Sequence, residues 1–225
     1  MILDKNIPFN HIAVEGMMKS GKGKLVQAIA KQIGARAVFD RTDNPYIKDF
    51  YEEKEGSAFL TQLVFLVNRY HQQSTLLQRE LFSERIICDY LFEKDKIYAY
   101  QTLTDEELIV YEKIFSIFYE KIAKPDLTIY LQVSLPTILK RISQTGSDIE
   151  KNISEKYLED IIEAFDYFFF NYQATPLLVI KSDDLDFENR GEVEDIIDKI
   201  AQMKKNTLYY VPIGKEDQKK RDNHK

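Results

Sequence analysis

The sequence of 225 residues predicts a single α/β domain with three layers, in which helices cover both faces of a five-stranded parallel sheet. Two observations predict this class. Short apolar runs alternate with longer segments of helical periodicity, and the first apolar run leads directly into a glycine-containing loop. Strands that alternate with helices form parallel sheets with right-handed crossovers. The length also favours one domain, because it is about one and a half times the common domain size.

The first half of the chain shows three apolar, β-favouring runs separated by helical patterns. Apolar residues recur at helical spacing after the first run until Gly34, which is a typical helix terminator. Pro45 suits the first position of a helix. The expected elements are a strand at 11–14, a helix ending at Gly34, a strand at 35–39, a helix beginning near Pro45, a helix at 57–81 and a strand at 85–89.

Capping residues mark the helices of the second half. Thr104 and Glu107 form a capping-box pattern, Ser134 and Pro136 open a further helix, and Ser154 caps an aromatic-rich one. The expected elements are a helix from 104 to about 122, a strand at 127–133, a helix from 134 through 141, a polar loop at 144–152, a helix from 154 to about 172, a strand at 177–180 and a helix at 193–203.

A domain boundary is expected near residue 205. The domain would span residues 8–205, and residues 206–225 would form a charged tail. The last part of this tail, residues 215–225, consists almost entirely of charged and polar residues, so we expect the tail to be disordered.

Composition excludes several classes of partner. The net charge is −6, with 37 acidic and 31 basic residues, whereas binding to nucleic acid or to an anionic membrane requires a cationic face. No uninterrupted apolar run approaches the roughly 18 residues of a membrane span. Cys88 is the only cysteine, so no intramolecular disulfide can form. These observations predict a cytoplasmic protein that binds neither nucleic acid nor membrane.

The glycine-containing loop fits the pattern G-x-x-x-x-G-K through Gly16, Gly21 and Lys22. In this pattern the glycines let backbone N–H groups curl around a phosphate, and the lysine reaches the β- and γ-phosphates of a nucleotide. The interpretation is a phosphate-binding loop (P-loop), although Lys19 and Lys24 could simply remain in solvent. The predicted nucleotide-binding residues of the loop are Gly16, Met17, Met18, Lys19, Ser20, Gly21, Lys22, Gly23 and Lys24.

Gly23 departs from the usual pattern, because the position after the lysine normally carries a Ser or Thr whose hydroxyl holds Mg²⁺. Two carboxylates could compensate for the missing hydroxyl. Asp40 and Asp89 each follow a predicted strand, so both belong at the sheet edge where parallel sheets bind ligands. One could be a general base and the other a ligand of metal or water. The alternative is that they cap helices or carry solvated loop charge.

Several stretches of the sequence resemble the deoxynucleoside kinases, which are P-loop enzymes that phosphorylate the 5′-hydroxyl of deoxynucleosides with ATP. The similarity runs from about residue 11 to residue 180 and implies the fold of that family. The stretches that carry it are DNPYIKDFYE (43–52), SAFLTQ (57–62), NRY (68–70), DYLFEKDKIYA (89–99) and PDLTIYL (125–131).

The resemblance implies roles for residues outside the glycine loop. Gln62 is similar to the amide that reads the nucleobase, and Tyr51 and Glu150 to the pair that holds the sugar 3′-hydroxyl. Arg69 corresponds to an arginine near the 5′-hydroxyl and the catalytic acid, and Arg141 to one that stacks on the ATP adenine. The family also implies ATP and Mg²⁺ as cofactors, and a possible homodimer through the long helices.

The phosphate-transfer residues depart from the family at several positions. Phe39 stands where the family has the glutamate that acts as general base, one residue before Asp40. Cys88-Asp89-Tyr90 stands where an acidic-Arg-Ser triplet is usual. Thr145 and Ser147 occupy two places that normally carry the arginines of the lid. Because arginines at these places stabilise the transferring phosphoryl group, these departures are expected to affect the rate of phosphoryl transfer.

The favoured hypothesis is an ATP-dependent deoxynucleoside kinase of a divergent bacterial type, similar to deoxyadenosine and deoxyguanosine kinases. In it Lys22 contacts the phosphates, Asp40 is the base and Asp89 is the metal-side carboxylate. One alternative is a relative that binds nucleosides or nucleotides with little or no transfer. Another is a nucleoside monophosphate kinase, a class whose loop also has Gly after the lysine. The preferred base stays open, because one amide can pair with adenine, guanine or cytosine.

Overall fold

The computed structural model describes residues 6–77, 85–204 and 206–212, which form six strands and nine helices. The strands are β1 (His11–Gly16), β2 (Arg36–Val38), β3 (Ile86–Cys88), β4 (Leu127–Gln132), β5 (Leu177–Lys181) and β6 (Thr207–Tyr210). The helices are α1 (Lys22–Ile33), α2 (Ile47–Tyr51), α3 (Ser57–Leu77), α4 (Lys94–Thr102), α5 (Asp105–Tyr119), α6 (Leu135–Thr145), α7 (Asp148–Lys151), α8 (Glu155–Phe170) and α9 (Arg190–Gln202).

The six strands form one parallel sheet in the order β2-β3-β1-β4-β5-β6. In the register of the central strand, Ala13 of β1 lies opposite Cys88 of β3 on one side and Thr128 of β4 on the other. All strands therefore end at the same edge of the sheet. The loop after β1 and the residues after β2 and β3 meet there, which is where open parallel sheets bind ligands.

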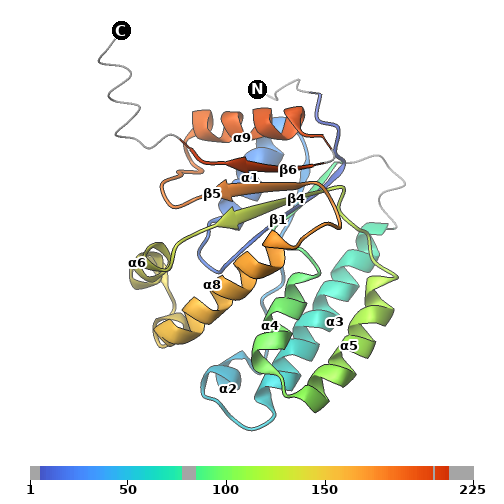
Figure 1. The fold of residues 1–225 in the computed structure, drawn as a ribbon, viewed down its shortest axis with the longest axis vertical. Coiled ribbons are helices and arrows are strands. Elements are labelled where there is room, and N and C mark those ends of the chain that lie inside the picture. The colour runs from blue at the N-terminus through green and yellow to red at the C-terminus, as the bar shows by residue number, and fades with distance from the viewer. Residues whose placement is uncertain (1–5, 78–84, 205, 213–225) are drawn as a thin grey trace.

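Helices cover both faces of the sheet, as Figure 1 shows. On one face, Ile12 and Val14 of β1 pack in a core cluster with apolar residues of α1 and α9. On the other face, Ala13 belongs to a second cluster with residues of α6 and α8. Side chains of a strand alternate between the two faces. The buried, almost wholly apolar β4 shows the same arrangement, so the three-layer prediction is confirmed.

A second group of helices extends beyond the sheet. Helix α4 packs against both α3 and α8, and α5 packs against α3 and α4. Figure 1 shows α3 and α5 side by side at the end of the molecule away from β5 and β6. A separate core cluster, which includes Leu66, Phe92 and Tyr111, holds these helices together. Helix α3 thereby reaches from this group to the ligand-binding edge of the sheet.

The fold differs from the sequence prediction in the number of strands, because β6 extends the sheet to six. Its four residues lie within the segment predicted to be a disordered tail, and they pair with β5 in parallel. Residues 207–210 do form a β-favouring run, but it lies close to the charged residues 215–225, and the composition of that end of the chain outweighs the local pattern in the prediction. The predicted tail from residue 213 onward, and the predicted extension of α3 from 78 to 81, lie outside the described residues.

Two short helices were also not predicted. Helix α4 has no single apolar face, because α3 and α8 cover it from different sides. Helix α7 lies within the predicted polar loop at 144–152 and is one turn long. It is held by a capping box between Ser147 and Glu150, a pattern that is readable in the sequence. No helix in the described ranges is both long and apolar enough to cross a bilayer.

Candidate active site

The glycine loop joins β1 to α1 in a conformation that requires its two outer glycines. A Cβ on Gly16 would stand 2.6 Å from the carbonyl oxygen of Leu131. Gly21 has φ +98°, and a Cβ there would stand 2.7 Å from the ring of Phe187. Lys22, the first residue of α1, folds back and donates from its Nζ to the carbonyl oxygen of Gly16 at 2.6 Å. The loop is therefore closed by its own lysine.

A cavity of about 490 Å³ opens on the outer side of this loop and is called the donor cavity here. Arg141 of α6 lines it and donates to the carbonyl oxygens of Lys19 at 2.8 Å and Ser20 at 3.1 Å. Arg141 therefore supports the loop backbone directly. The predicted residues that line the donor cavity are Met17, Lys19, Ser20, Gly21, Lys22, Gly23, Lys24, Asp89 and Arg141.

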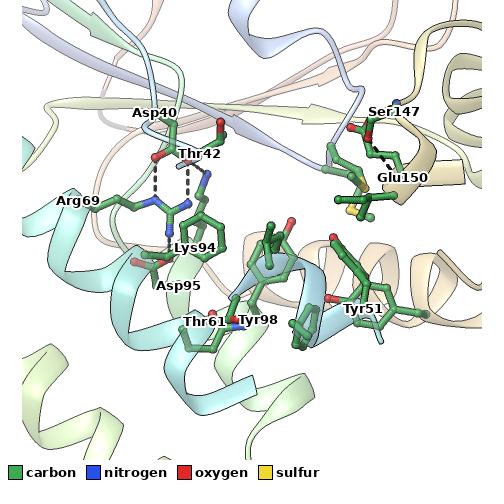
Figure 2. A pocket seen from close by; sticks show the side chains of 18 of the residues that line it. Asp40, Thr42, Tyr51, Thr61, Arg69, Lys94, Asp95, Tyr98, Ser147 and Glu150 are labelled. Atoms are coloured by element: carbon green, nitrogen blue, oxygen red, sulfur yellow. Dashed lines mark hydrogen bonds and ion pairs between the residues drawn. The ribbon is translucent and has the colours of Figure 1, made fainter. Parts of the chain in front are cut away.

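A second cavity, of about 420 Å³, lies on the other side of the loop and is called the acceptor cavity here. It is enclosed by residues from α2, α3, α4, α7 and α8, several of which are drawn in Figure 2. Gln62 and Arg69 of α3 both face it, as their spacing of two turns predicts. The predicted residues that line the acceptor cavity are Met17, Met18, Lys22, Asp40, Tyr51, Gln62, Arg69, Asp89 and Glu150.

Asp40, two residues after the end of β2, is the centre of an ion-pair cluster at the inner end of the acceptor cavity (Figure 2). Arg69 binds it with two hydrogen bonds, from Nε to Oδ1 at 3.0 Å and from Nη2 to Oδ2 at 2.8 Å. Lys94 donates from Nζ to Oδ2 at 2.7 Å. Burial alone would raise the pKa of Asp40, but Lys94 and Arg69 outweigh it and hold that pKa well below its usual range. Asp40 is therefore an ionised acceptor at neutral pH.

Lys94 and Asp95 belong to this cluster but were not predicted as site residues. Asp95 is almost fully buried, contacts the guanidinium of Arg69 through Oδ1, and leaves Oδ2 without a hydrogen-bond partner. Burial raises the pKa of Asp95 to about 6, against the opposing effect of Arg69. The signal in the sequence was a run of four charged residues in the matched stretch at 89–99, between the apolar Phe92 and Ile97.

Asp89 lines both cavities, at the point where they meet beside Lys22. Its Oδ1 accepts the backbone N–H of Asp40 at 2.6 Å, which ties the ends of β2 and β3 together. Its Oδ2 faces Gly23, where an added Cβ would stand 3.6 Å away. Burial raises the pKa of the Asp89 carboxyl, so a nearby cation would stabilise its charged form.

The position of Asp89 fits a magnesium site of the kind found with nucleotides. Mg²⁺ is commonly held by one or two protein carboxylates together with phosphate oxygens and water. Within the described residues, no three His, Cys, Asp or Glu side chains form a metal-binding group. A single carboxylate beside an anion-binding loop therefore matches the nucleotide-dependent type of site.

Tyr51 and Glu150 face each other across the outer part of the acceptor cavity (Figure 2). Burial, together with the charge of Glu150, raises the pKa of Tyr51 to about 12, so its hydroxyl stays protonated. Glu150 also accepts the Nζ of Lys19 at 3.0 Å. Lys19 further donates to the carbonyl oxygen of Thr145 at 3.2 Å, which connects the glycine loop to the carboxyl-terminal end of α6.

The remaining predicted side chains differ in how closely they approach the cavities. Gln62 is buried, and its Nε2 donates to Thr102 at 3.2 Å. Lys24 lies on the rim of the donor cavity with an exposed side chain and pairs with Glu188 at 2.7 Å. Of the two additional lysines in the loop, only Lys19 therefore turns toward the boundary between the cavities.

Comparisons with known proteins show which family the sequence resembles. The sequence model of the deoxynucleoside kinase family matches residues 12–205. A deoxyguanosine kinase of Bacillus subtilis (strain 168) is 31% identical over 199 residues, which cover 85% of this chain and 96% of that protein. A deoxyadenosine/deoxycytidine kinase of the same organism is 29% identical over 208 residues, covering 89% and 96%.

The fold is shared with a solved structure. The deoxyadenosine kinase from M. mycoides with bound dCTP superposes with a TM-score of 0.70 at 24% identity, over 86% of this chain and all of that one. At this identity the likeness concerns the arrangement of strands and helices.

Proposed function

Because this chain belongs to the deoxynucleoside kinase family, we propose that it transfers the γ-phosphoryl group of ATP to the 5′-hydroxyl of a deoxynucleoside. The observation that carries the proposal is the meeting of two cavities at Lys22 and Asp89, which line both. ATP occupies the donor cavity with its phosphates on the glycine loop, and the nucleoside occupies the acceptor cavity. The 5′-oxygen then faces the γ-phosphorus across Lys22.

In this reaction a bond forms between the 5′-oxygen and the γ-phosphorus while the bond from that phosphorus to the β–γ bridging oxygen breaks. The bridging oxygen leaves with ADP, and the hydroxyl proton passes to Asp40. Lys22 neutralises the β- and γ-phosphate charge. Asp89 would hold Mg²⁺, which would supply further positive charge at these oxygens. Such transfer depends mainly on positioning and electrostatic stabilisation, so fixed groups suffice.

The acceptor cavity supports a neutral nucleoside better than a nucleoside monophosphate. Lys22 lies 3.4 Å from Glu15, Arg69 contacts Asp40 and Asp95, and Lys94 contacts Asp40. Every lysine and arginine that lines this cavity within the described ranges therefore already faces a carboxylate. An additional phosphate group would find no available cation, because Lys22 is assigned to the phosphates of ATP and Arg69 and Lys94 are held by carboxylates, whereas sugar hydroxyls and a base need only hydrogen bonds.

The proposed contacts of the nucleoside follow from the polar groups that line this cavity. Gln62 offers one donor and one acceptor to the base edge. Tyr51 and Glu150 bind the 3′-hydroxyl, for which the protonated phenol is a donor and the carboxylate an acceptor. Phe50 and Tyr157 supply aromatic surface beside Tyr51.

Lys19 is proposed to supply part of the positive charge that Thr145 and Ser147 do not provide. Its Nζ contacts the carbonyl oxygen of Thr145, at the boundary of the two cavities. When Glu150 turns to the sugar, the ammonium of Lys19 becomes available to the γ-phosphate. Lys24 is assigned a weaker, peripheral contact because its side chain is exposed and paired with Glu188.

A homodimer through α3 and α5 is also proposed, in a cytoplasmic setting. These two helices expose an unusual number of large apolar side chains for a solvent-facing surface. Association of two copies would bury them, and analytical ultracentrifugation would measure it. The exposed apolar residues of this surface are Leu60 and Val67 of α3 and Ile109, Val110 and Ile117 of α5.

The test is incubation of the purified protein with Mg-ATP and each of the four deoxynucleosides, with Lys22→Ala as control. Formation of a 5′-monophosphate that depends on Lys22 supports the proposal. Calorimetric binding of a nucleoside without product above the control would instead indicate a binding protein, an alternative favoured by Gly23, by Phe39 and by the lack of lid arginines at Thr145 and Ser147. Product from dAMP or dTMP, with none from nucleosides, would indicate a monophosphate kinase.

A further inference from the structure

Lys94 is a buried cation in a place that disfavours cations. It is the first residue of α4, and only 6% of its surface is exposed. The amino-terminal end of a helix carries partial positive charge, and an ammonium group loses hydration on burial. Both effects oppose a lysine at this position. Neighbouring groups must therefore stabilise the charge of Lys94. These groups show which part of the site the lysine supports.

Two carboxylates surround the Lys94 ammonium. Asp40 accepts from Nζ at 2.7 Å, and Oε2 of Glu15 lies 3.8 Å away. Glu15 in turn accepts the backbone N–H of Gly16 at 2.8 Å and that of Leu91 at 2.8 Å. Glu15 therefore links the start of the glycine loop to the turn before α4. This link fixes the base of the Lys94 side chain relative to the phosphate-binding loop.

The geometry of Asp40 shows what Lys94 adds. A carboxylate has about four acceptor positions, two on each oxygen. Arg69 occupies one position on Oδ1 and one on Oδ2, and Lys94 occupies the second position on Oδ2 (Figure 2). One position on Oδ1 remains for a substrate hydroxyl. Without Lys94 an acceptor position on Oδ2 would also be free, so the carboxylate would offer two acceptor positions to the hydroxyl instead of one.

The residue after Asp89 does not supply the positive charge that Lys94 brings to Asp40. Tyr90 is fully buried, and the centre of its ring lies 5.9 Å from the Lys94 ammonium, so it forms an apolar wall beside the cation. The charged groups around Asp40 come from each element that packs against it. They are Glu15 of β1, Lys22 of α1, Arg69 of α3, Lys94 and Asp95 of α4, and Asp89 after β3.

We propose that Lys94 is a positioning residue for phosphoryl transfer, which acts by fixing the Asp40 carboxylate so that one Oδ1 position receives the 5′-hydroxyl of the nucleoside. The proposal rests on the proposed function and adds a residue to it. Lys94 itself need not touch the substrate. Its effect on the reaction therefore depends on Asp40. Replacing Asp40 can thus distinguish this effect from a direct contact between Lys94 and the substrate.

The experiment compares Lys94→Met with Lys96→Met, a matched change two residues along the same helix. Lys96 is partly exposed and interacts with Glu112 at 3.9 Å, away from both cavities. Lys94→Met should lower kcat on the order of 10-fold to 100-fold, with the KM values for nucleoside and ATP little changed. Lys96→Met should leave both parameters unchanged.

Two further readouts separate positioning from a merely structural role. Loss of the ammonium frees the second acceptor position on Oδ2, so a crystal structure of Lys94→Met should show either a turned Asp40 carboxylate or a new partner on Oδ2. In an Asp40→Asn background, Lys94→Met should have almost no further effect on kcat. An equal loss of kcat in both backgrounds, or an Asp40 carboxylate that keeps its position with no new partner on Oδ2, would overturn the proposal.

The design also separates this proposal from the function on which it rests. If the wild type forms no product with any deoxynucleoside, the proposed function fails. The crystal structure of Lys94→Met then decides about Lys94 alone, because an Asp40 carboxylate that keeps its position with no new partner on Oδ2 contradicts the positioning role. If Lys94→Met does not fold, Lys94→Gln removes the charge while keeping a polar side chain, and the same kinetic comparisons apply.

Discussion

Replacement of Gly23 by serine tests how the site manages without the hydroxyl that usually follows the lysine of such a loop. Gly23 is the second residue of α1 and has no strained backbone conformation. A Cβ there would lie 3.6 Å from Oδ2 of Asp89 and 3.9 Å from the ring of Phe39, which are ordinary van der Waals distances. The side chain therefore fits, and its hydroxyl would point into the space beside Asp89.

The expected magnitudes separate two effects. Glycine is less favourable in a helix than alanine by about 1 kcal/mol and than serine by about 0.5 kcal/mol. For a chain of this size the corresponding rise in Tm is about 2 to 4 °C for Gly23→Ala and about half of that for Gly23→Ser, as upper values for a first-turn position. Serine alone adds an oxygen ligand. One polar contact to a charged group, at about 1 kcal/mol, lowers the Mg²⁺ concentration for half-maximal activity roughly fivefold.

The assay is a Mg²⁺ titration of nucleoside phosphorylation for wild type, Gly23→Ala and Gly23→Ser. Alanine is the matched control, because it adds the same Cβ and removes the same glycine without adding a hydroxyl. We expect the half-saturating Mg²⁺ concentration to fall only in Gly23→Ser. Identical Mg²⁺ curves for the two variants would refute the placement of the metal beside Asp89.

Three further changes probe the loop, the buried cluster and the base contact. Gly21→Ala should lower unfolding stability by about 1 to 3 kcal/mol more than Gly56→Ala in thermal melts, because both have positive φ but only Gly21 faces Phe187 at 2.7 Å. The free energy of unfolding of the wild type, measured by chemical denaturation relative to that of Asp95→Asn, should rise as the pH falls from about 6 toward 4. The folded pKa is about 6 against an ordinary value of 3.8, so folding takes up a proton in that window. Gln62→Ala should weaken nucleoside binding on the order of tenfold in calorimetry, and unchanged binding would show that Gln62 does not contact the base.

Much of the sheet could be predicted because its signals are local. The apolar run of β4 and the glycine loop after β1 each lie within a few consecutive residues, and Asp40 and Asp89 follow strands whose carboxyl ends must share one edge. Gly34 ends α1 in the left-handed conformation, as a helix terminator does. These features depend on short-range sequence, which periodicity captures.

The features that could not be predicted depend on tertiary contacts. Lys94 and Asp40 are 54 residues apart, and no local pattern connects them. Helix α4 is covered by α3 and α8, which erases the amphipathic pattern by which a helix is recognised. The contact of Lys19 with Glu150 likewise depends on how α7 folds back over the glycine loop. Charge pairing within the cavities thus required the three-dimensional structure.

The most direct test of the central claim uses a bisubstrate ligand in which the 5′-oxygen of a deoxynucleoside is joined through a polyphosphate chain to adenosine. Calorimetry should show one ligand per chain, binding at least 100-fold more tightly than ATP, because one molecule fills both cavities and the second contact becomes intramolecular. Bound ligand should exclude both ATP and the free nucleoside. Affinity no higher than that of ATP, or simultaneous binding of a free nucleoside, would contradict the claim that donor and acceptor cavities meet at Lys22 and Asp89.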